Sequence, residues 1–209
     1  MYAAVQNRPD GSGVIYRVNK DGTAYTILHQ FENENSGAPG ALIETREHEL
    51  WGTTGRNGVG TIFKMSLDGS GPTTVRTLNS PPRGPLLESG GALFGVTCGR
   101  NAIYGDHDDP GFIFRINKDG SGFGVLRAFS WDQPAPGWAP AGSLIEGNDS
   151  FLYGTTGQGG LTKKGTIFRL RKDGTGFVTL YNFRGDTDGE YPHAGVMEGS
   201  DGALYGTTG

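Results

Sequence analysis

The sequence contains one cysteine, few apolar residues and no long apolar run. Cys98 has no second thiol, which excludes an internal disulfide and a zinc site built from cysteine pairs. Hydrophobic residues make up only 34% of the chain. The chain has no run of about 18 apolar residues, which is the length that a membrane-spanning helix needs. No apolar run of the signal-peptide type follows Met1. Disulfide-stapled, zinc-ribbon and membrane-inserted classes are therefore excluded.

Charged residues are few and balanced between the two signs. The chain has 18 lysines and arginines against 22 aspartates and glutamates, a net charge of −4 with both signs interspersed. A nucleic-acid backbone is bound by a basic patch, so we expect no nucleic-acid partner.

The sequence also lacks the usual motifs for phosphate and calcium. It contains no Gly-Lys-Ser/Thr phosphate loop, and each recurring Asp-Gly turn offers one carboxylate where calcium takes roughly six to eight oxygens. We expect neither a cofactor nor a metal.

Glycine, in contrast, is abundant. It supplies 38 of the 209 residues, about 18%, whereas about 7% is usual in proteins. Each glycine inside a helix costs about 1 kcal/mol relative to alanine, so this composition disfavours helix. Together with the low apolar content it predicts an all-β protein rich in turns.

Four short segments recur in the same order along the chain. The isoleucine segment reads Gly-x-Ile-aromatic-base-aliphatic, and an Asp-Gly turn joins it to an apolar segment. The glutamate segment then pairs two aliphatic residues with Glu, and the threonine segment reads Leu-aromatic-Gly-x-Thr. Isoleucine segments begin at residues 13, 60, 111 and 165, and threonine segments occupy 50–54, 93–97, 152–156 and 204–208, with a decayed copy at 1–5.

Four strand-like segments in a repeat of about 50 residues predict a β-propeller blade. Short runs rich in Ile, Phe, Tyr, Thr and Val, separated by Asp-Gly turns, form antiparallel meanders. Propeller repeats have periods of about 40 to 50 residues, and solenoid coils are shorter. We expect one repeat domain over 1–209, either a four-bladed ring or, because four-bladed rings are rare, a fragment of a larger propeller. Repeat units are predicted at 13–59, 60–110, 111–164 and 165–209, with a partial unit at 1–12.

Loops of the predicted blade fall into two classes. With the threonine segment innermost, followed outward by the isoleucine, apolar and glutamate segments, antiparallel pairing places alternate loops on opposite faces. Loops after the isoleucine and glutamate segments are stereotyped, whereas loops after the threonine and apolar segments differ in every copy. Function commonly resides on loops held by a rigid scaffold, so the second face is the expected binding face.

Residues present in every copy are expected to serve the scaffold. A base recurs in the isoleucine segment and a glutamate in the glutamate segment, and we expect them to pair between strands or blades. The isoleucine and the aromatic residue of each isoleucine segment are expected in the core. These positions are Arg17, Lys64, Arg115 and Arg169; Glu44, Glu88, Glu146 and Glu198; Ile15, Ile62, Ile113 and Ile167; and Tyr16, Phe63, Phe114 and Phe168.

The repeated words resemble those of a known bacterial family. The order Gly-x-Ile-Phe-Arg, Asp-Gly, Leu-Ile-Glu-Gly and Leu-Tyr-Gly-Thr-Thr is similar to that of the choice-of-anchor tandem repeat proteins called GloVer-containing, over essentially the whole chain. The resemblance implies a β-propeller in a secreted or cell-surface protein whose repeats precede a varied surface anchor. It implies no particular biochemical activity.

The richest loops of the expected binding face belong to one predicted blade, whose innermost strand is the threonine segment 93–97. Loops 98–110 and 130–140 combine two tryptophans and a tyrosine with several carboxylates, a set that can stack on a sugar and bind its hydroxyls. Alternatively, the tryptophans fill gaps over the blade edge. The candidate ligand-binding residues are Arg100, Tyr104, Asp106, Trp131, Asp132 and Trp138.

These observations favour a non-catalytic binding module for carbohydrate or another protein, with no catalytic residue assigned. The alternative is a propeller-type polysaccharide hydrolase or lyase, in which Asp106 or Asp108 would act with Asp132. Glycosidase carboxyl groups must lie about 5 to 9.5 Å apart across a cleft. A purely structural spacer is the third alternative.

Overall fold

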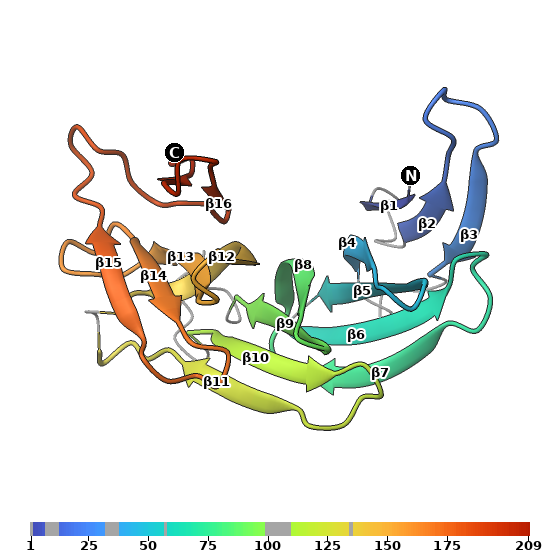
Figure 1. The fold of residues 1–209 in the computed structure, drawn as a ribbon, viewed down its shortest axis with the longest axis horizontal. Helices are drawn as coiled ribbons and strands as arrows, with labels where there is room; N and C mark the ends of the chain where they lie inside the picture. Colours follow the sequence, from blue (N-terminus) through green and yellow to red (C-terminus); the bar gives the residue numbers. More distant parts are fainter. Residues whose placement is uncertain (1, 7–12, 32–37, 57, 99–109, 134–135) are drawn as a thin grey trace. The chain divides into compact units, whose positions relative to one another are not determined.

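The computed structural model describes residues 2–6, 13–31, 38–56, 58–98, 110–133 and 136–209, and every regular element among them is a β-strand. This agrees with the all-β class predicted from the glycine content. No helix in these ranges is long and apolar enough to cross a membrane. The strands gather in two compact units, Met1–Leu86 and Leu87–Gly209 (Figure 1).

The first unit contains two antiparallel sheets. One has three strands in the order β1-β2-β3, and the other has four strands in the order β4-β5-β6-β7. Their bounds are β1 Tyr2–Gln6, β2 Gly13–Arg17, β3 Thr26–Gln30, β4 Ala38–Glu44, β5 Glu49–Arg56, β6 Val59–Ser66 and β7 Thr73–Leu78.

The second unit contains two four-stranded sheets and a hairpin. The sheets have the orders β8-β9-β10-β11 and β12-β13-β14-β15, and β16 pairs with β17. The first residues of β8 precede the unit. The bounds are β8 Pro82–Ser89, β9 Ala92–Thr97, β10 Phe112–Asn117, β11 Gly124–Ala128, β12 Trp138–Glu146, β13 Leu152–Gln158, β14 Thr166–Leu170, β15 Val178–Asn182, β16 Met197–Glu198 and β17 Leu204–Tyr205.

All four recurring segments form strands, but their order within a sheet differs from the expectation. The glutamate segment is the first strand of each four-stranded sheet and pairs with the threonine segment that follows it, as β12 does with β13. The glutamate segment was expected to pair with the apolar segment that precedes it in the chain, and it does not. The threonine segment is therefore the second strand, flanked on both sides, and not the innermost edge strand that its sequence predicted.

Loop length explains this order. The glutamate and threonine segments are joined by tight turns, such as Gly90-Gly91 between β8 and β9, where both glycines have positive φ. Short turns of this kind close antiparallel hairpins. By contrast, residues 183–196 separate the apolar segment β15 from β16, a loop too long to force neighbouring strands into one hairpin.

Glycine in the threonine segment makes room for side chains that cross over the strand. A Cβ atom at Gly52 of β5 would lie 2.5 Å from Cζ of Phe63 and 2.6 Å from Cδ2 of Leu42. At Gly154 of β13 the corresponding distances to Phe168 and Leu144 are 2.6 and 2.9 Å. The recurring glycine thus allows the aromatic residue of one neighbouring strand to meet the leucine of the other.

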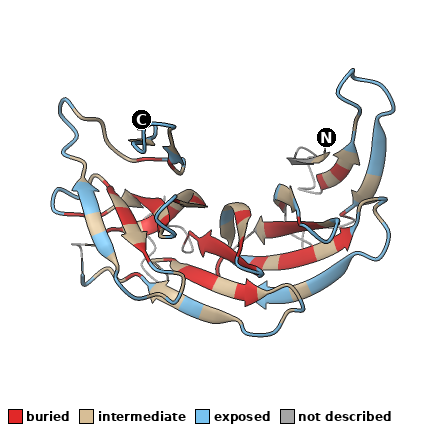
Figure 2. Cartoon of the chain, in the orientation of Figure 1, coloured by how far each residue is buried: buried red, intermediate tan, exposed pale blue. Residues whose placement is uncertain are grey.

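Burial follows the strand order. Figure 2 shows that β9 is buried throughout and that β10 alternates between buried and half-buried residues, whereas β7 is mostly exposed and β11 is half-buried or exposed. Edge strands of a blade expose one row of backbone groups and part of one face. Of the eight predicted core positions, six are buried, and Tyr16 and Ile167 are half-buried.

Candidate functional site

Every four-stranded sheet has two different ends. Because neighbouring strands are antiparallel, the turns after the first and third strands leave from one end, here called the turn end. The loops after the second and fourth strands leave from the opposite end, here called the variable end. The division into two loop classes inferred from the sequence therefore holds for the observed strand order.

The turn end is built from one repeated hydrogen-bond pattern. In each Asp-Gly turn the aspartate Oδ1 accepts hydrogen bonds from the backbone N–H and the hydroxyl of the Ser or Thr two residues later. For Asp68 and Ser70 the distances are 2.9 and 2.7 Å, and the glycine after each aspartate has φ between 84° and 88°. The other pairs are Asp21 with Thr23, Asp119 with Ser121 and Asp173 with Thr175.

These bonds stabilise the ionised carboxylates. The side-chain hydrogen bond from Ser70, followed by the bond from its backbone N–H, lowers the pKa of Asp68 below its usual value. The pKa values of Asp21 and Asp173 are lowered in the same way. Each carboxylate is thus occupied within its own turn, as expected for a scaffold element.

The recurring glutamates also lie at the turn end, but their partners differ from those predicted. Nζ of Lys118, in the β10–β11 turn, lies 2.6 Å from Oε1 of Glu88 on β8. Lys172 and Glu146 form the same ion pair between the β14–β15 turn and β12. Two of the four recurring glutamates therefore pair with turn lysines, and no ion pair between these glutamates and the recurring strand bases is present among the described residues.

Two of the recurring bases pack against aromatic residues of the adjacent hairpin. Nζ of Lys64 lies 2.9 Å from Glu49 Oε1 and 5.5 Å from the Trp51 ring centroid. The guanidinium of Arg169 lies 4.6 Å from the Phe151 ring and 3.8 Å from Asp149 Oδ2. Both contacts are cation–π interactions reinforced by a carboxylate, which gives these bases a structural role.

At the variable end, the described part of the predicted site is a tryptophan pair. The rings of Trp131 and Trp138 meet edge to face with centroids 5.0 Å apart. Both side chains are half-buried and pack against Cys98 and Ala139. Nε1 of Trp138 donates a hydrogen bond to Oε1 of Gln158 at 2.9 Å, which fixes the indole. This pair combines anchoring on one side with an exposed remainder.

The other predicted site residues divide between exposed and undescribed positions. Asp132 is exposed, and its backbone N–H donates to Oγ of Ser130 at 3.2 Å. Arg100, Tyr104 and Asp106 lie outside the described residues, as does Asp108 of the hydrolase alternative. The described residues contain no group of three His, Cys, Asp or Glu placed to hold a metal ion.

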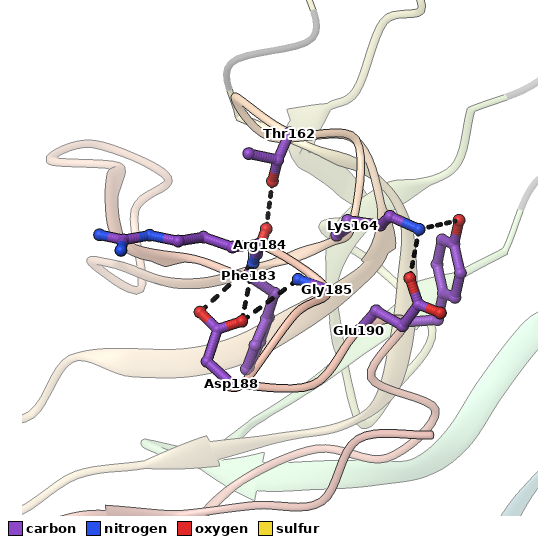
Figure 3. Close-up of polar contacts among 8 residues, drawn as sticks. Thr162, Lys164, Phe183, Arg184, Gly185, Asp188 and Glu190 are labelled. Carbon is purple, nitrogen blue, oxygen red and sulfur yellow. Dashed lines mark hydrogen bonds and ion pairs between the residues drawn. The ribbon is translucent and has the colours of Figure 1, made fainter.

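Loop 159–165 adjoins the tryptophan pair and presents an exposed leucine. A Cβ atom at Gly159 would lie 2.6 Å from Cε3 of Trp138, so the two loops are in close contact. The side chain of Leu161 is 78% exposed, although its backbone N–H donates to Oδ1 of Asn182 at 2.9 Å. The hydroxyl of Thr162 donates to the carbonyl of Phe183 (Figure 3). An apolar side chain is thus held out toward solvent on a fixed loop.

Loop 183–196 is ordered by its own acidic residues. Asp188 accepts hydrogen bonds from the backbone N–H groups of Arg184 and Gly185 (Figure 3). It accepts another, at 2.6 Å, from the hydroxyl of Tyr181. The hydrogen bond from the Tyr181 hydroxyl lowers the pKa of Asp188 most; burial opposes this effect, and the backbone bonds lower the pKa further. This carboxylate therefore closes the loop from within.

A second contact ties loop 183–196 to loop 159–165. Lys164 forms an ion pair with Glu190, and its Nζ lies 3.1 Å from the hydroxyl of Tyr191 (Figure 3). The hydrogen bonds that its ammonium donates to Glu190 and then to Tyr191 raise the pKa of Lys164. Sequence reasoning singled out neither Leu161 nor Lys164; the only available signal was that their loop differs from its counterparts in the other repeats.

The fold is that of a β-propeller protein. It combines four-stranded antiparallel meanders with one stereotyped set of turns and one variable set of loops. The sequence over residues 82–209 matches the Gloeobacter/Verrucomicrobia repeat, and the chain belongs to that repeat family. No curated protein matches the chain in sequence.

Solved propeller structures share this fold at low sequence identity. TolB from Acinetobacter baumannii is 12% identical over 99% of this chain and 47% of its own, with a TM-score of 0.63. An oligogalacturonate lyase in complex with manganese is 14% identical over 94% and 53% of the two chains, with a TM-score of 0.60. The matching chain of a nidogen/laminin complex is 16% identical over 92% of this chain and 63% of its own, with a TM-score of 0.58. The chain thus spans about half to two thirds of the length of these structures.

Proposed function

We propose that the chain is a non-catalytic repeat module that binds a carbohydrate or protein ligand through the variable end of its sheets. The observation that carries the proposal is the contrast between the two ends within one chain. Four Asp-Gly turns keep the same hydrogen bonds, whereas the loops of the opposite end share neither length nor sequence. A scaffold that holds loops of free sequence is a common basis for ligand binding.

Two features of the variable end support two ligand classes. The half-buried tryptophan pair supports a carbohydrate, because indole faces stack on sugar rings. The exposed Leu161, flanked by the exposed Lys163 and Arg184, supports a protein partner, because interface anchors are apolar residues within a polar rim. The described residues do not favour a polysaccharide hydrolase or lyase, because Asp132, the candidate acid that lies among them, is exposed.

A secreted or cell-surface location is part of the proposal and rests on the family resemblance. Cell fractionation of a bacterium that produces the natural protein tests it directly. Recovery of the protein only in the cytoplasmic fraction would contradict a surface role.

The binding proposal is tested with a glycan array and, in parallel, affinity capture on the isolated chain. Each screen is repeated with Trp131→Ala and with Leu161→Ser. A glycan lost only in the tryptophan variant identifies a carbohydrate module, and a protein lost only in the leucine variant identifies a protein-binding module. Turnover of a polysaccharide by the purified chain would instead establish the catalytic alternative.

A further inference from the structure

The space between neighbouring sheets of the second unit is filled by an aromatic ring. Phe177, just before β15, stacks on Phe168 of β14 with centroids 5.3 Å apart and planes at 24°. It also meets Phe129 of the preceding sheet edge-on at 6.1 Å, and the guanidinium of Arg127 lies 4.5 Å from its centroid. The ring of Phe177 thus occupies a slot with two aromatic walls and a basic lid.

Two other sheets have a ring in the same position over the aromatic residue of the isoleucine segment, here called the platform ring. Phe123 stacks on Phe114 at 5.8 Å and 27°, and Tyr25 lies over Tyr16 at 5.2 Å and 32°. In each sheet the platform ring lies just after a register shift in the pairing of its strand with the strand that follows. The ring that lies over it comes two residues before the residue that pairs with the platform ring. Those partners are Thr179 for Phe168, Val125 for Phe114 and Ile27 for Tyr16.

The sheet β4–β7 breaks this rule. Its platform ring is Phe63, which pairs with Thr74 after the same register shift. Residue 72 is therefore in the stacking position, and it is a proline, exposed to solvent. The opposite wall is retained, because Phe31 meets Phe63 at 5.8 Å, close to the 6.0 Å between Phe129 and Phe168.

The missing ring leaves a cavity of about 350 Å³ in the first unit. Phe31, Phe63 and Pro72 form its apolar lining, and His29 and four threonines add polar groups. His29 stands where the second unit has Arg127, since the two residues pair with Ile15 and Ile113 respectively. The threonines are Thr61, Thr73, Thr74 and Thr77.

We propose that this cavity is a binding site for a phenol ring, which would stack on Phe63 as Phe177 stacks on Phe168. The chain itself shows which shape fits the slot, because a phenylalanine ring fills it in the second unit. The imidazole of His29 and the hydroxyls of Thr74 and Thr77 give the first-unit slot a polar rim that a phenolic hydroxyl can hydrogen-bond. A volume of about 350 Å³ lies within the range of ~300 to 1,000 Å³ usual for ligand pockets.

The site is independent of the variable end and of the function proposed there. The phenol ring can belong to a free small molecule or to a tyrosine side chain. Two probes separate these sources: p-cresol, which is the ring alone, and N-acetyl-tyrosine amide, which adds the peptide backbone. Binding of both assigns a tyrosine-bearing ligand, and binding of p-cresol alone assigns a free phenol.

The test is an NMR titration of the whole chain with each probe. We expect saturable shifts of the His29, Thr74 and Thr77 side-chain signals. Pro72→Phe supplies the missing ring from the chain itself and is expected to weaken p-cresol binding at least about tenfold and to raise the Tm. The backbone permits this change, because Gly71 has a φ of 62°, close to the 61° and 64° of Gly122 and Gly176 that precede phenylalanines.

A reciprocal variant tests the same geometry in the second unit. Phe177→Ala empties the slot between Phe168 and Phe129, and p-cresol should then shift signals there that it leaves unchanged in the parent chain. If Pro72→Phe does not fold, Phe63→Leu removes the stacking platform and is expected to give the same loss. Unchanged p-cresol shifts in the folded Pro72→Phe or Phe63→Leu variant would overturn the proposal. Equal binding of cyclohexanol or methyl glucoside would also overturn it, because neither is an aromatic ring.

Discussion

Ser89, at the end of β8, donates a hydrogen bond to Glu146, at the end of β12 in the adjacent sheet. Glu146 also pairs with Lys172 of its own sheet. The next glutamate repeats the link between sheets, because the backbone N–H and the side-chain amide of Asn148 donate to Glu198 at 2.9 and 3.0 Å. One carboxylate per sheet therefore joins the second unit's neighbouring sheets at the turn end.

The first prediction concerns the titration of Glu146. Burial alone would raise the pKa of this carboxyl, but the hydrogen bonds from Lys172 and Ser89 outweigh burial and lower it below its ordinary value. A lowered pKa means that the contribution to stability is complete above the pKa of the unfolded chain and is lost as the pH falls through the folded value. Lys172→Met should raise the pKa of Glu146, as measured by carbon-detected NMR titration.

Ser89→Ala is the matched comparison for that titration. It removes one hydroxyl donor and leaves the ammonium in place, so a smaller rise in the pKa of Glu146 is expected. An unaltered titration curve in the Lys172→Met variant would show that the ion pair is not formed in solution.

The second prediction concerns Lys118, whose partner Glu88 is only 15% exposed. Lys118→Leu removes a charged donor from a largely buried carboxylate and should lower the free energy of unfolding by about 1 to 3 kcal/mol. The first unit has a leucine, Leu67, at this turn position, and there Glu44 lies 3.0 Å from Nδ1 of His48 instead. Urea denaturation of both chains measures the difference.

Lys20→Leu is the control for that experiment. Lys20 occupies the same turn position in the sheet β1–β3, which contains no glutamate strand among its described residues, and its side chain is exposed. Its replacement should change the stability by less than about 0.5 kcal/mol, as is usual for surface positions. Equal losses in the two variants would indicate a general effect of leucine in the turn.

Much of this fold could be predicted from the sequence. The recurring segments became strands, and the Asp-Gly pairs became turns, because both depend on local chemistry: β-branched and aromatic runs favour strands, and glycine permits positive φ. The order of strands within a sheet could not be read so directly. Four segments that recur without interruption can be divided into sheets at any of four connections, and only loop lengths such as Gly90-Gly91 against 183–196 decide between them.

The arrangement of the candidate site was predictable to a smaller extent. Comparing loops between repeats located the variable end and the pair Trp131 and Trp138, which the structure brings into contact. Leu161 was missed, because its exposure depends on how Asn182 holds the loop. The substitution of Pro72 for an aromatic residue is visible in aligned apolar segments, yet its consequence depends on the two retained rings and needed the structure.

The third prediction concerns the crowded glycine of the threonine segment. Gly52→Ala places a Cβ atom 2.5 Å from the Phe63 ring, closer than real contacts allow, so either the ring or the strand must move. Overpacking of this kind costs roughly 1 to 3 kcal/mol. Gly124→Ala is the matched control, because nothing lies within 4 Å of a Cβ atom there. Thermal unfolding should show a clear loss of Tm for Gly52→Ala and almost none for Gly124→Ala.

The last prediction concerns the tryptophan pair at the variable end. If the proposed carbohydrate ligand stacks there, Trp131→Ala and Trp138→Ala should each weaken its binding by roughly 1 kcal/mol or more, as truncation of an aromatic anchor usually does. Trp138→Ala should also lower the Tm, because its indole packs on Cys98 and bonds to Gln158. Isothermal titration with a ligand identified on the array, combined with thermal unfolding, separates the two effects. Asp132→Ala should leave the Tm unchanged, since its side chain is exposed. Full binding by both tryptophan variants would remove the pair from the site and favour a structural spacer.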